Sequence, residues 1–205
     1  MVYARTLGAH TYTFQVSGKL WRNSFIMEDR ETSTSWSHVT GRALGGPGRG
    51  AQLQALPSVQ TTWAEWKQAY PETDVLKKSE EVLSSHYEKY FSDPNRMGLF
   101  RAQWLHEVMP GKTLVWGATS GVHAVAVTDE ALALDGRVEV ELGGTAVGVE
   151  RGADGGVRAY AGEDRDEIPV TRAFWFAWSS FYPNTRVIDE CCFIIVCLRV
   201  PIIRR

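Results

Sequence analysis

The sequence predicts a mixed α+β fold: an antiparallel, sheet-rich scaffold in two related halves, each ending in a tryptophan-rich helix stopped by a proline. The first observation behind this prediction is a pair of similar tryptophan motifs at a constant offset of 112 positions, from Trp63 to Trp175. The second is that much of the remaining sequence consists of short valine-rich or alternating runs bounded by glycine, a pattern typical of antiparallel strands. A few helices in a mainly β framework are therefore expected.

The two tryptophan motifs read TTWAEWKQAYPETDVL over residues 61–76 and RAFWFAWSSFYPNTRVI over residues 172–188. A run of matches at one offset without a gap predicts a duplicated unit. The matching pairs are Trp63 and Trp175, Trp66 and Trp178, Tyr70 and Tyr182, Pro71 and Pro183, Thr73 and Thr185, and Val75 and Val187.

Each motif predicts one short helix. Tryptophans three positions apart share a helix face with a tyrosine seven positions after the first, and the proline that follows ends the helix. In the first motif, Thr62 and Glu65 have the spacing of a capping box, and the polar residues between the rings leave a solvated face. The second motif has almost no polar face, so we expect its helix to be buried on most sides.

A weaker similarity organises the rest of the chain. VYARTLGAHTYTF and VGVERGADGGVRAY both read as a strand, a glycine turn and a second strand, but the distance to the helix is longer in the first case. We therefore predict a first half-repeat over residues 1–76 with an inserted loop at 29–58, and a helical connector over 77–112. A second half-repeat follows over 113–188, with a tail over 189–205.

The bulk composition limits the function classes. The chain has 205 residues, 44% of them hydrophobic, and a formal net charge of −2 with acids and bases interspersed. Without a basic stripe to contact phosphates, nucleic acid is not an expected partner. No apolar run reaches the roughly 18 residues that predict a membrane span, so no transmembrane segment is expected. A small-molecule ligand is compatible with the sequence, which assigns neither a cofactor nor an oligomeric state.

The candidate binding site lies in DRETSTSWSHVTGRALGGPGRG, residues 29–50, because this polar stretch is inserted into only one half and added loops often carry function. The predicted function is ligand binding by a domain of unknown biochemical activity. The candidate ligand-binding residues share polar or aromatic side chains within this loop: Asp29, Arg30, Thr32, Ser35, Trp36, Ser37, His38 and Thr40.

Two other functions remain open at this stage. A metal-assisted hydrolase or redox enzyme could use Asp29, His38 and His10 as ligands, although no HExxH or similar spacing fixes them. A structural or interaction module is the other alternative, in which the aromatic helices bind a partner segment. The simplest structural interpretation is that Asp29, Thr32 and Ser33 close a turn while His38 is a hydrogen-bonded sheet residue.

The block DRxTxSxWSxxTGxAxxGP and the two tryptophan-proline motifs resemble the bacterial and archaeal domain of unknown function 3179 family, from about residue 2 to 188. That family has no established activity to carry over. The resemblance implies a leader or lipoprotein-type start and a CPxCxxA-like motif upstream, so we expect an N-terminally truncated domain whose compartment is not determined. The positions on the block are Asp29, Arg30, Thr32, Ser35, Trp36, Ser37, Thr40, Gly41, Ala43, Gly46 and Pro47.

Overall fold

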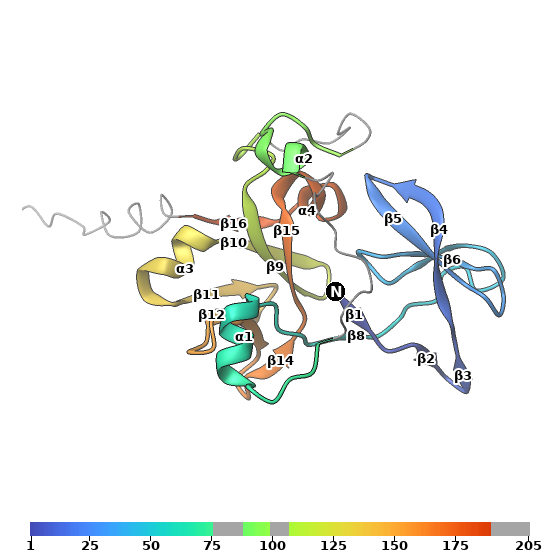
Figure 1. The fold of residues 1–205 in the computed structure, drawn as a ribbon, viewed down its shortest axis with the longest axis horizontal. Helices are drawn as coiled ribbons and strands as arrows, with labels where there is room; N and C mark the ends of the chain where they lie inside the picture. Colours follow the sequence, from blue (N-terminus) through green and yellow to red (C-terminus); the bar gives the residue numbers. More distant parts are fainter. Residues whose placement is uncertain (76–87, 99–106, 190–205) are drawn as a thin grey trace, which may run out of the picture.

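The computed structural model describes residues 1–75, 88–98 and 107–189. It is a mixed α+β structure, rich in strands, with several antiparallel sheets arranged as an N-terminal and a C-terminal unit side by side (Figure 1). Within the described part of the chain, no helix is both long and apolar enough to cross a membrane.

The N-terminal unit is built around a four-stranded antiparallel meander, β4-β5-β6-β7, with two short strand pairs, β1–β8 and β2–β3, beside it. Arg22 and Asn23 join β4 to β5 with positive φ angles of 51° and 61°, as a tight primed turn requires. The strands are β1 (Val2–Tyr3), β2 (Thr6–Leu7), β3 (His10–Thr11), β4 (Phe14–Trp21), β5 (Ser24–Asp29), β6 (Ser35–Ser37), β7 (Ala43–Gly45) and β8 (Ala55–Leu56).

Segment 29–58 is not the loop predicted from the sequence. It supplies β6, β7 and β8, and its side chains Trp36, Ala43 and Leu53 form the core of the N-terminal unit. These strands were not recognised in the sequence, because each is only two or three residues long. That length is too short to show an alternation of apolar and polar residues.

The C-terminal unit has two four-stranded sheets, β15-β9-β10-β16 and β11-β12-β13-β14. All of their pairs are antiparallel except β10 with β16, because β16 returns to the sheet after a helix. The elements are β9 (Leu114–Ser120), β10 (His123–Thr128), α3 (Asp129–Asp135), β11 (Arg137–Leu142), β12 (Thr145–Arg151), β13 (Val157–Ala161), β14 (Asp166–Ile168), β15 (Val170–Phe174), α4 (Trp175–Phe181) and β16 (Arg186–Ile188).

The β9–β10 hairpin has a covered face on either side. On one face, Trp116, Val125 and Val127 join a core with valines of the other sheet. On the other face, Val115 and Ala126 pack beneath α4 in a cluster that also holds Ala124, Trp175 and Trp178. The alternation of side chains along each strand accounts for both cores. The second tryptophan helix is therefore buried, as its missing polar face predicted.

The helix α1 (Trp63–Ala69) begins with the predicted capping box: the Thr62 hydroxyl accepts the Glu65 amide, and the Glu65 carboxylate accepts the Thr62 amide. Of the predicted connector 77–112, the described part includes α2 (Glu88–Ser92), while residues 77–87 and 99–106 lie outside the described residues. The tail predicted over 189–205 is described only at its first residue.

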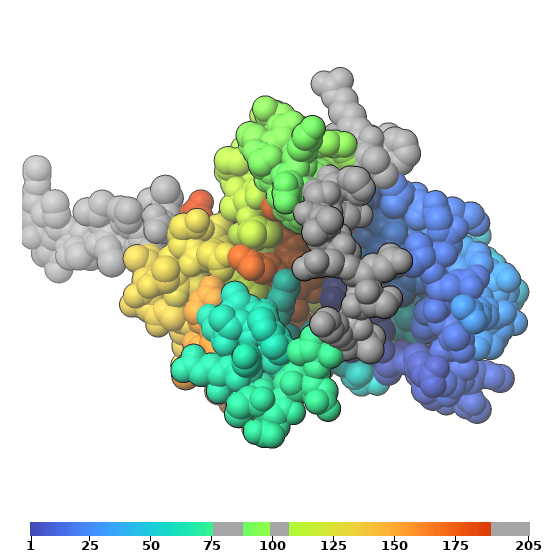
Figure 2. All heavy atoms as spheres, viewed as in Figure 1, coloured from blue at the N-terminus to red at the C-terminus, as the bar shows by residue number. Residues whose placement is uncertain are grey.

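α1 packs against the C-terminal unit instead of its own meander. The Thr61 hydroxyl donates to the carbonyl oxygen of Asp154 at 3.2 Å, and a side chain at Gly155 would collide with the Glu65 carboxylate. Segment 57–75 therefore crosses from one unit to the other, and α1 protrudes at the surface beside the C-terminal sheets (Figures 1 and 2).

Candidate functional site

Asp29 holds together the turn that was predicted as a binding loop. Its side chain is fully buried. One carboxylate oxygen accepts hydrogen bonds from the Thr32 amide at 2.6 Å and from the Thr32 hydroxyl at 2.8 Å. The other accepts a hydrogen bond from the Trp36 indole N–H at 2.7 Å. Burial alone would raise the pKa of Asp29, but these hydrogen bonds hold it below its usual value. Ser33 completes the turn with a positive φ of 57°.

The glycines after this turn serve packing. Gly46 has a φ of 93°, and a side chain there would come within 2.8 Å of the Thr34 backbone. The Gly48 amide donates to the Thr34 hydroxyl at 3.0 Å. Because Thr34 is completely buried, the glycine run folds against the same turn that Asp29 closes.

The other predicted binding residues face different surroundings. Arg30 is exposed, and its Nε donates to the side-chain oxygen of Gln15. Ser35 lies on β6, opposite Glu28 in register. The Ser37 hydroxyl accepts the Thr40 amide at 3.1 Å, which shapes the turn after β6. The structure thus separates Arg30 and Ser35 from the turn that carries Thr40.

His38 lies just beyond the end of β6, in that turn, so it is not the sheet residue that the simplest structural interpretation expected. Its ring stacks on Phe25 with centroids 4.1 Å apart. Burial, together with the charge of the chain's N-terminal amine, lowers the pKa of His38. The described residues contain no cluster of three or more His, Cys, Asp or Glu that could hold a metal, so Asp29, His38 and His10 are not brought together.

A cleft of about 300 Å³, here called the inter-unit cleft, lies where Thr40 faces the C-terminal unit. Thr40 and Gln52 belong to its N-terminal wall, and Thr119, Thr171 and Tyr182 to the opposite wall. Trp178 and Gly117 also line it. Of the residues predicted to bind ligand, Thr40 is the one that the structure brings to this cleft.

Tyr3 forms part of the N-terminal wall and was not predicted from the sequence. Its ring packs against Gly41, where a side chain would approach to 2.6 Å, and its hydroxyl donates toward the carbonyl oxygens of His38 and Val39 at 3.0 and 2.9 Å. Burial and the neighbouring Tyr182 raise the pKa of Tyr3, and burial raises that of Tyr182. Both phenols are therefore neutral at physiological pH.

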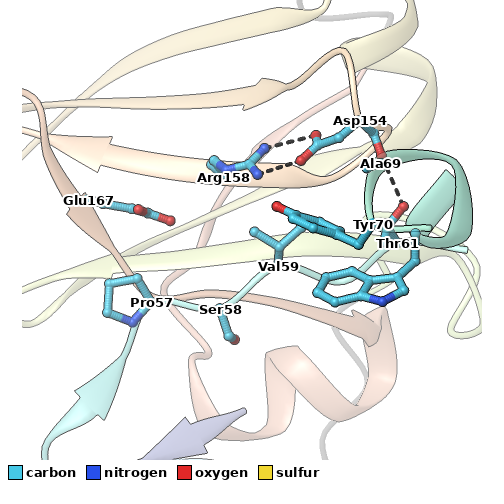
Figure 3. Close-up of a pocket in the computed structure, with 10 residues that line it drawn as sticks. Pro57, Ser58, Val59, Thr61, Ala69, Tyr70, Asp154, Arg158 and Glu167 are labelled. Atoms are coloured by element: carbon cyan, nitrogen blue, oxygen red, sulfur yellow. Dashed lines mark hydrogen bonds and ion pairs between the residues drawn. The ribbon is translucent and has the colours of Figure 1, made fainter. Parts of the chain in front are cut away.

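A second cleft of about 340 Å³, the α1 cleft, lies between α1 and the C-terminal unit (Figure 3). Trp66 and Tyr70 line one side, and Glu167 lines the other. Arg158 binds both carboxylate oxygens of Asp154, at 3.0 and 2.5 Å. Hydrogen bonds from Arg158, with a smaller contribution from the Gly156 amide, lower the pKa of Asp154 to about 2. Aromatic rings therefore line one side of the cleft, and the other side holds an ion pair in which Arg158 and Asp154 bind each other.

Corresponding residues line the two clefts. In each case a tryptophan indole donates to a threonine hydroxyl seven positions later, at 3.0 Å for Trp66 and 2.9 Å for Trp178. The Trp–Tyr ring centroids are 4.4 Å apart in α1 and 4.3 Å apart in α4. The equivalent lining pairs, all at the offset of 112, are Pro57 and Pro169, Val59 and Thr171, Trp66 and Trp178, and Tyr70 and Tyr182. Extending the same offset toward the N-terminus would have found the identical pair Pro57 and Pro169 from the sequence, whereas Val59 and Thr171 differ in residue type.

A third hollow, of about 220 Å³, surrounds Asp129 between α1 and the C-terminal unit. One carboxylate oxygen of Asp129 accepts hydrogen bonds from the Trp116 indole at 2.7 Å and from the Arg151 guanidinium at 2.8 Å. The other oxygen accepts a hydrogen bond from the Arg172 guanidinium at 2.8 Å. Burial opposes ionisation of Asp129, but these donors keep its pKa below the ordinary value. These mutually paired charges bind the elements of the C-terminal unit to one another.

The comparisons identify the family. A family model described as a protein of unknown function, DUF3179, matches residues 1–165. The chain belongs to the DUF3179 family. The DUF3179 match includes α1 but ends before α4, whereas the likeness inferred from the sequence extended to residue 188. No curated protein and no solved structure matched the chain. Membership in DUF3179 carries no biochemical activity with it, and the activity of the chain is unknown.

Proposed function

We propose that this DUF3179 protein is a binding domain whose inter-unit cleft holds an uncharged, polar small molecule. The observation that carries the proposal is the chemistry of the lining. Around the Trp178 indole, the lining side chains offer the hydroxyls of Thr119, Thr171 and Tyr182 and the Gln52 amide, and none of the lining side chains is charged. The charge carried by the lining residues is the N-terminal amine of Met1. A cleft with an aromatic wall and a few hydrogen-bonding groups is typical of small-molecule sites.

The predicted loop at 29–50 contributes to this site mainly by shaping it. Thr40 and Val39 line the cleft directly. Ser37 positions the Thr40 amide, while Asp29 and Trp36 hold the turn before it. In this proposal, ligand contact belongs to Thr40, and the remaining predicted loop residues support the wall.

The correspondence between the clefts supports the further proposal that the chain contains two related halves. The segments 57–75 and 169–187 run in the same order: a proline, a short extended stretch, a tryptophan helix and a Trp–Thr hydrogen bond. The cleft wall formed by Trp178 and Tyr182 is then one of two copies of a repeated unit, and the N-terminal meander is material particular to the first copy.

The experiment is a binding measurement with a defined panel of uncharged probes, namely mono- and disaccharides and nucleosides, by saturation-transfer-difference NMR. We expect at least one probe to bind. Tyr182→Phe and Thr119→Val each remove a single hydroxyl and should weaken that binding about five-fold, or ~1 kcal/mol for one hydrogen bond. Matched controls are Tyr12→Phe and Thr145→Val, which lie outside the cleft lining.

Two results would contradict the proposal. One is an absence of binding across the panel by folded protein. The other is binding that Tyr182→Phe and Thr119→Val leave unchanged relative to their controls. Either result would mean that the inter-unit cleft is only a seam between the two units.

A further inference from the structure

We propose that α1 is the docking site for an antiparallel β-hairpin whose first strand presents a glycine to Trp66, the same kind of hairpin that β9 and β10 present to α4. The occupant is a partner segment of this chemistry. The docking surface consists of the ring face of α1, with Trp63, Trp66 and Tyr70, together with the flanking stretches 58–62 and 74–75. It is a different surface from the inter-unit cleft, so this inference rests on the proposed repeat and not on the proposed ligand.

The two tryptophan helices have the same local geometry but opposite burial. Trp63 is 53% exposed and Trp66 36%, whereas the equivalent Trp175 and Trp178 are 1% and 2% exposed. Each helix has seven residues and ends at a tyrosine whose amide donates to the second tryptophan's carbonyl oxygen. The helices differ on their outer face, where only α1 carries Glu65, Lys67 and Gln68. The ring positions are the same in both, so the difference in the burial of the rings reflects what covers each helix.

The cover of α4 is the β9–β10 hairpin. Gly117 faces the Trp178 ring so closely that a side chain would come within 2.4 Å of it, and Val115, Ala124 and Ala126 complete the apolar contact. The strand before α4 and the strand after it then pair with the two edges of the hairpin. This pairing gives the sheet order β15-β9-β10-β16.

The stretches beside α1 have no such hairpin between them in the described chain. Residues 58–62 correspond to β15 and residues 74–75 to the start of β16, yet neither stretch belongs to a strand there. Val75 is 64% exposed, while its equivalent Val187 pairs with Ala126 of β10. Among the described residues, the position that the hairpin takes beside α4 is therefore not filled beside α1, where the aromatic rings are exposed.

This geometry defines the chemistry of the partner. One strand would pair antiparallel with 58–62 and the other parallel with 74–75, as β9 and β10 do in the C-terminal unit. Adding strands satisfies open backbone edges, and alternate side chains supply specificity. A glycine is needed opposite Trp66, because any side chain there would strike the indole as it would at Gly117. Val or Ala should occupy the neighbouring inward positions.

A second copy of this chain is a poorer occupant. Its own β9–β10 hairpin already lies under α4, in a cluster with almost completely buried side chains. Offering that hairpin to another molecule would uncover Trp175 and Trp178 and cost the burial that holds them. Figure 3 shows that the side of Tyr70 near the C-terminal unit faces Asp154, Arg158 and Glu167, so a partner must approach from the other side.

The test uses a head-to-tail cyclised peptide with the sequence of residues 114–128, whose antiparallel structure is first verified by circular dichroism. We expect it to bind the intact chain saturably, shift tryptophan emission to the blue, and protect amides of 58–62 and 74–75 from hydrogen exchange. The control peptide carries valine in place of the glycine equivalent to Gly117 and should not bind.

Protein variants locate the surface. Trp66→Ala should weaken peptide binding at least about ten-fold, as expected for a central aromatic anchor. Trp21→Ala is the matched control, because Trp21 is also 36% exposed but lies on β4. Tyr182→Phe should leave peptide binding unchanged, which separates this surface from the inter-unit cleft.

Four outcomes would overturn the inference: no saturable binding of the verified hairpin, equal binding of the valine peptide, protection of residues 170–174 in place of 58–62, or an unaltered affinity in Trp66→Ala. Self-association of the chain that Trp66→Ala abolishes, measured by sedimentation, would likewise overturn it by assigning the surface to a second copy.

Discussion

Gly117 on β9 lies directly under the Trp178 ring of α4, and a Cβ at this glycine would be 2.4 Å from the nearest ring carbons. Both residues are buried, and the Trp178 ring is packed in a cluster with Val115 and Ala126, so it moves aside only at a cost. Gly117→Ala should therefore lower the free energy of unfolding by about 1–3 kcal/mol, the usual cost of overpacking. Urea denaturation followed by circular dichroism measures the effect.

Gly45→Ala provides the control for that substitution. Gly45 is also a strand glycine without a positive φ, and a Cβ added there would meet no described atom within 4 Å. Its replacement should change stability little. Combining Gly117→Ala with Trp178→Leu should recover part of the loss, since the smaller side chain makes room, and a double-mutant cycle measures that coupling. Strict additivity would mean that the two groups do not clash.

Asp29→Ala should destabilise the N-terminal meander by about 2–4 kcal/mol, because it leaves the buried Trp36 indole N–H and the Thr32 amide without an acceptor. Arg30→Ala, at the exposed neighbouring position, should cost less than about 0.5 kcal/mol. Chemical denaturation of both variants makes the comparison. Equal effects would show that the Asp29 carboxylate does not hold the turn.

Ser179→Ala should stabilise the protein. The Ser179 hydroxyl is fully buried in α4 and has no hydrogen-bond partner among the described residues. Removing an unsatisfied hydroxyl and adding a strong helix former should contribute about 1 kcal/mol and raise Tm by roughly 2–4 °C. Ser180→Ala is the comparison, because its hydroxyl donates to the Phe176 carbonyl oxygen, and it should give no gain. A lowered Tm in Ser179→Ala would refute the assignment.

Stability should fall as the pH drops below 6.5 because of His38. Burial and the N-terminal amine lower the pKa of His38 in the folded state below its ordinary 6.5, so the unfolded chain binds a proton more readily. The stabilisation is complete above the unfolded pKa and is lost as the pH falls from there toward the folded pKa. Urea melts between pH 5 and 7.5 should show a shallower slope in His38→Gln. An unchanged slope would exclude His38 as the source.

The tryptophan motifs and the capping box of α1 were recognisable in the sequence because both depend on contacts within one or two helical turns. Thr62 and Glu65 form the predicted reciprocal hydrogen bonds. The strands at Ser35–Ser37 and Ala43–Gly45 were missed because each is too short for its alternation to be recognised. Pro57 and Pro169 were missed because they lie upstream of the two tryptophan motifs, although the same offset relates them.

The sequence by itself determined where α1 begins, since its capping box acts locally, and where α1 and α4 end, since a proline follows the tyrosine after each helix. It also established the DUF3179 resemblance that the family match confirms. Only the tertiary structure decided that Asp29 is a buried acceptor, that Thr40 faces a cleft, and that Trp178 is covered while Trp66 is open. Burial depends on which distant strands lie against a side chain. The two helices share their ring spacing and the proline that follows, yet in the described chain only α4 has a hairpin packed on it.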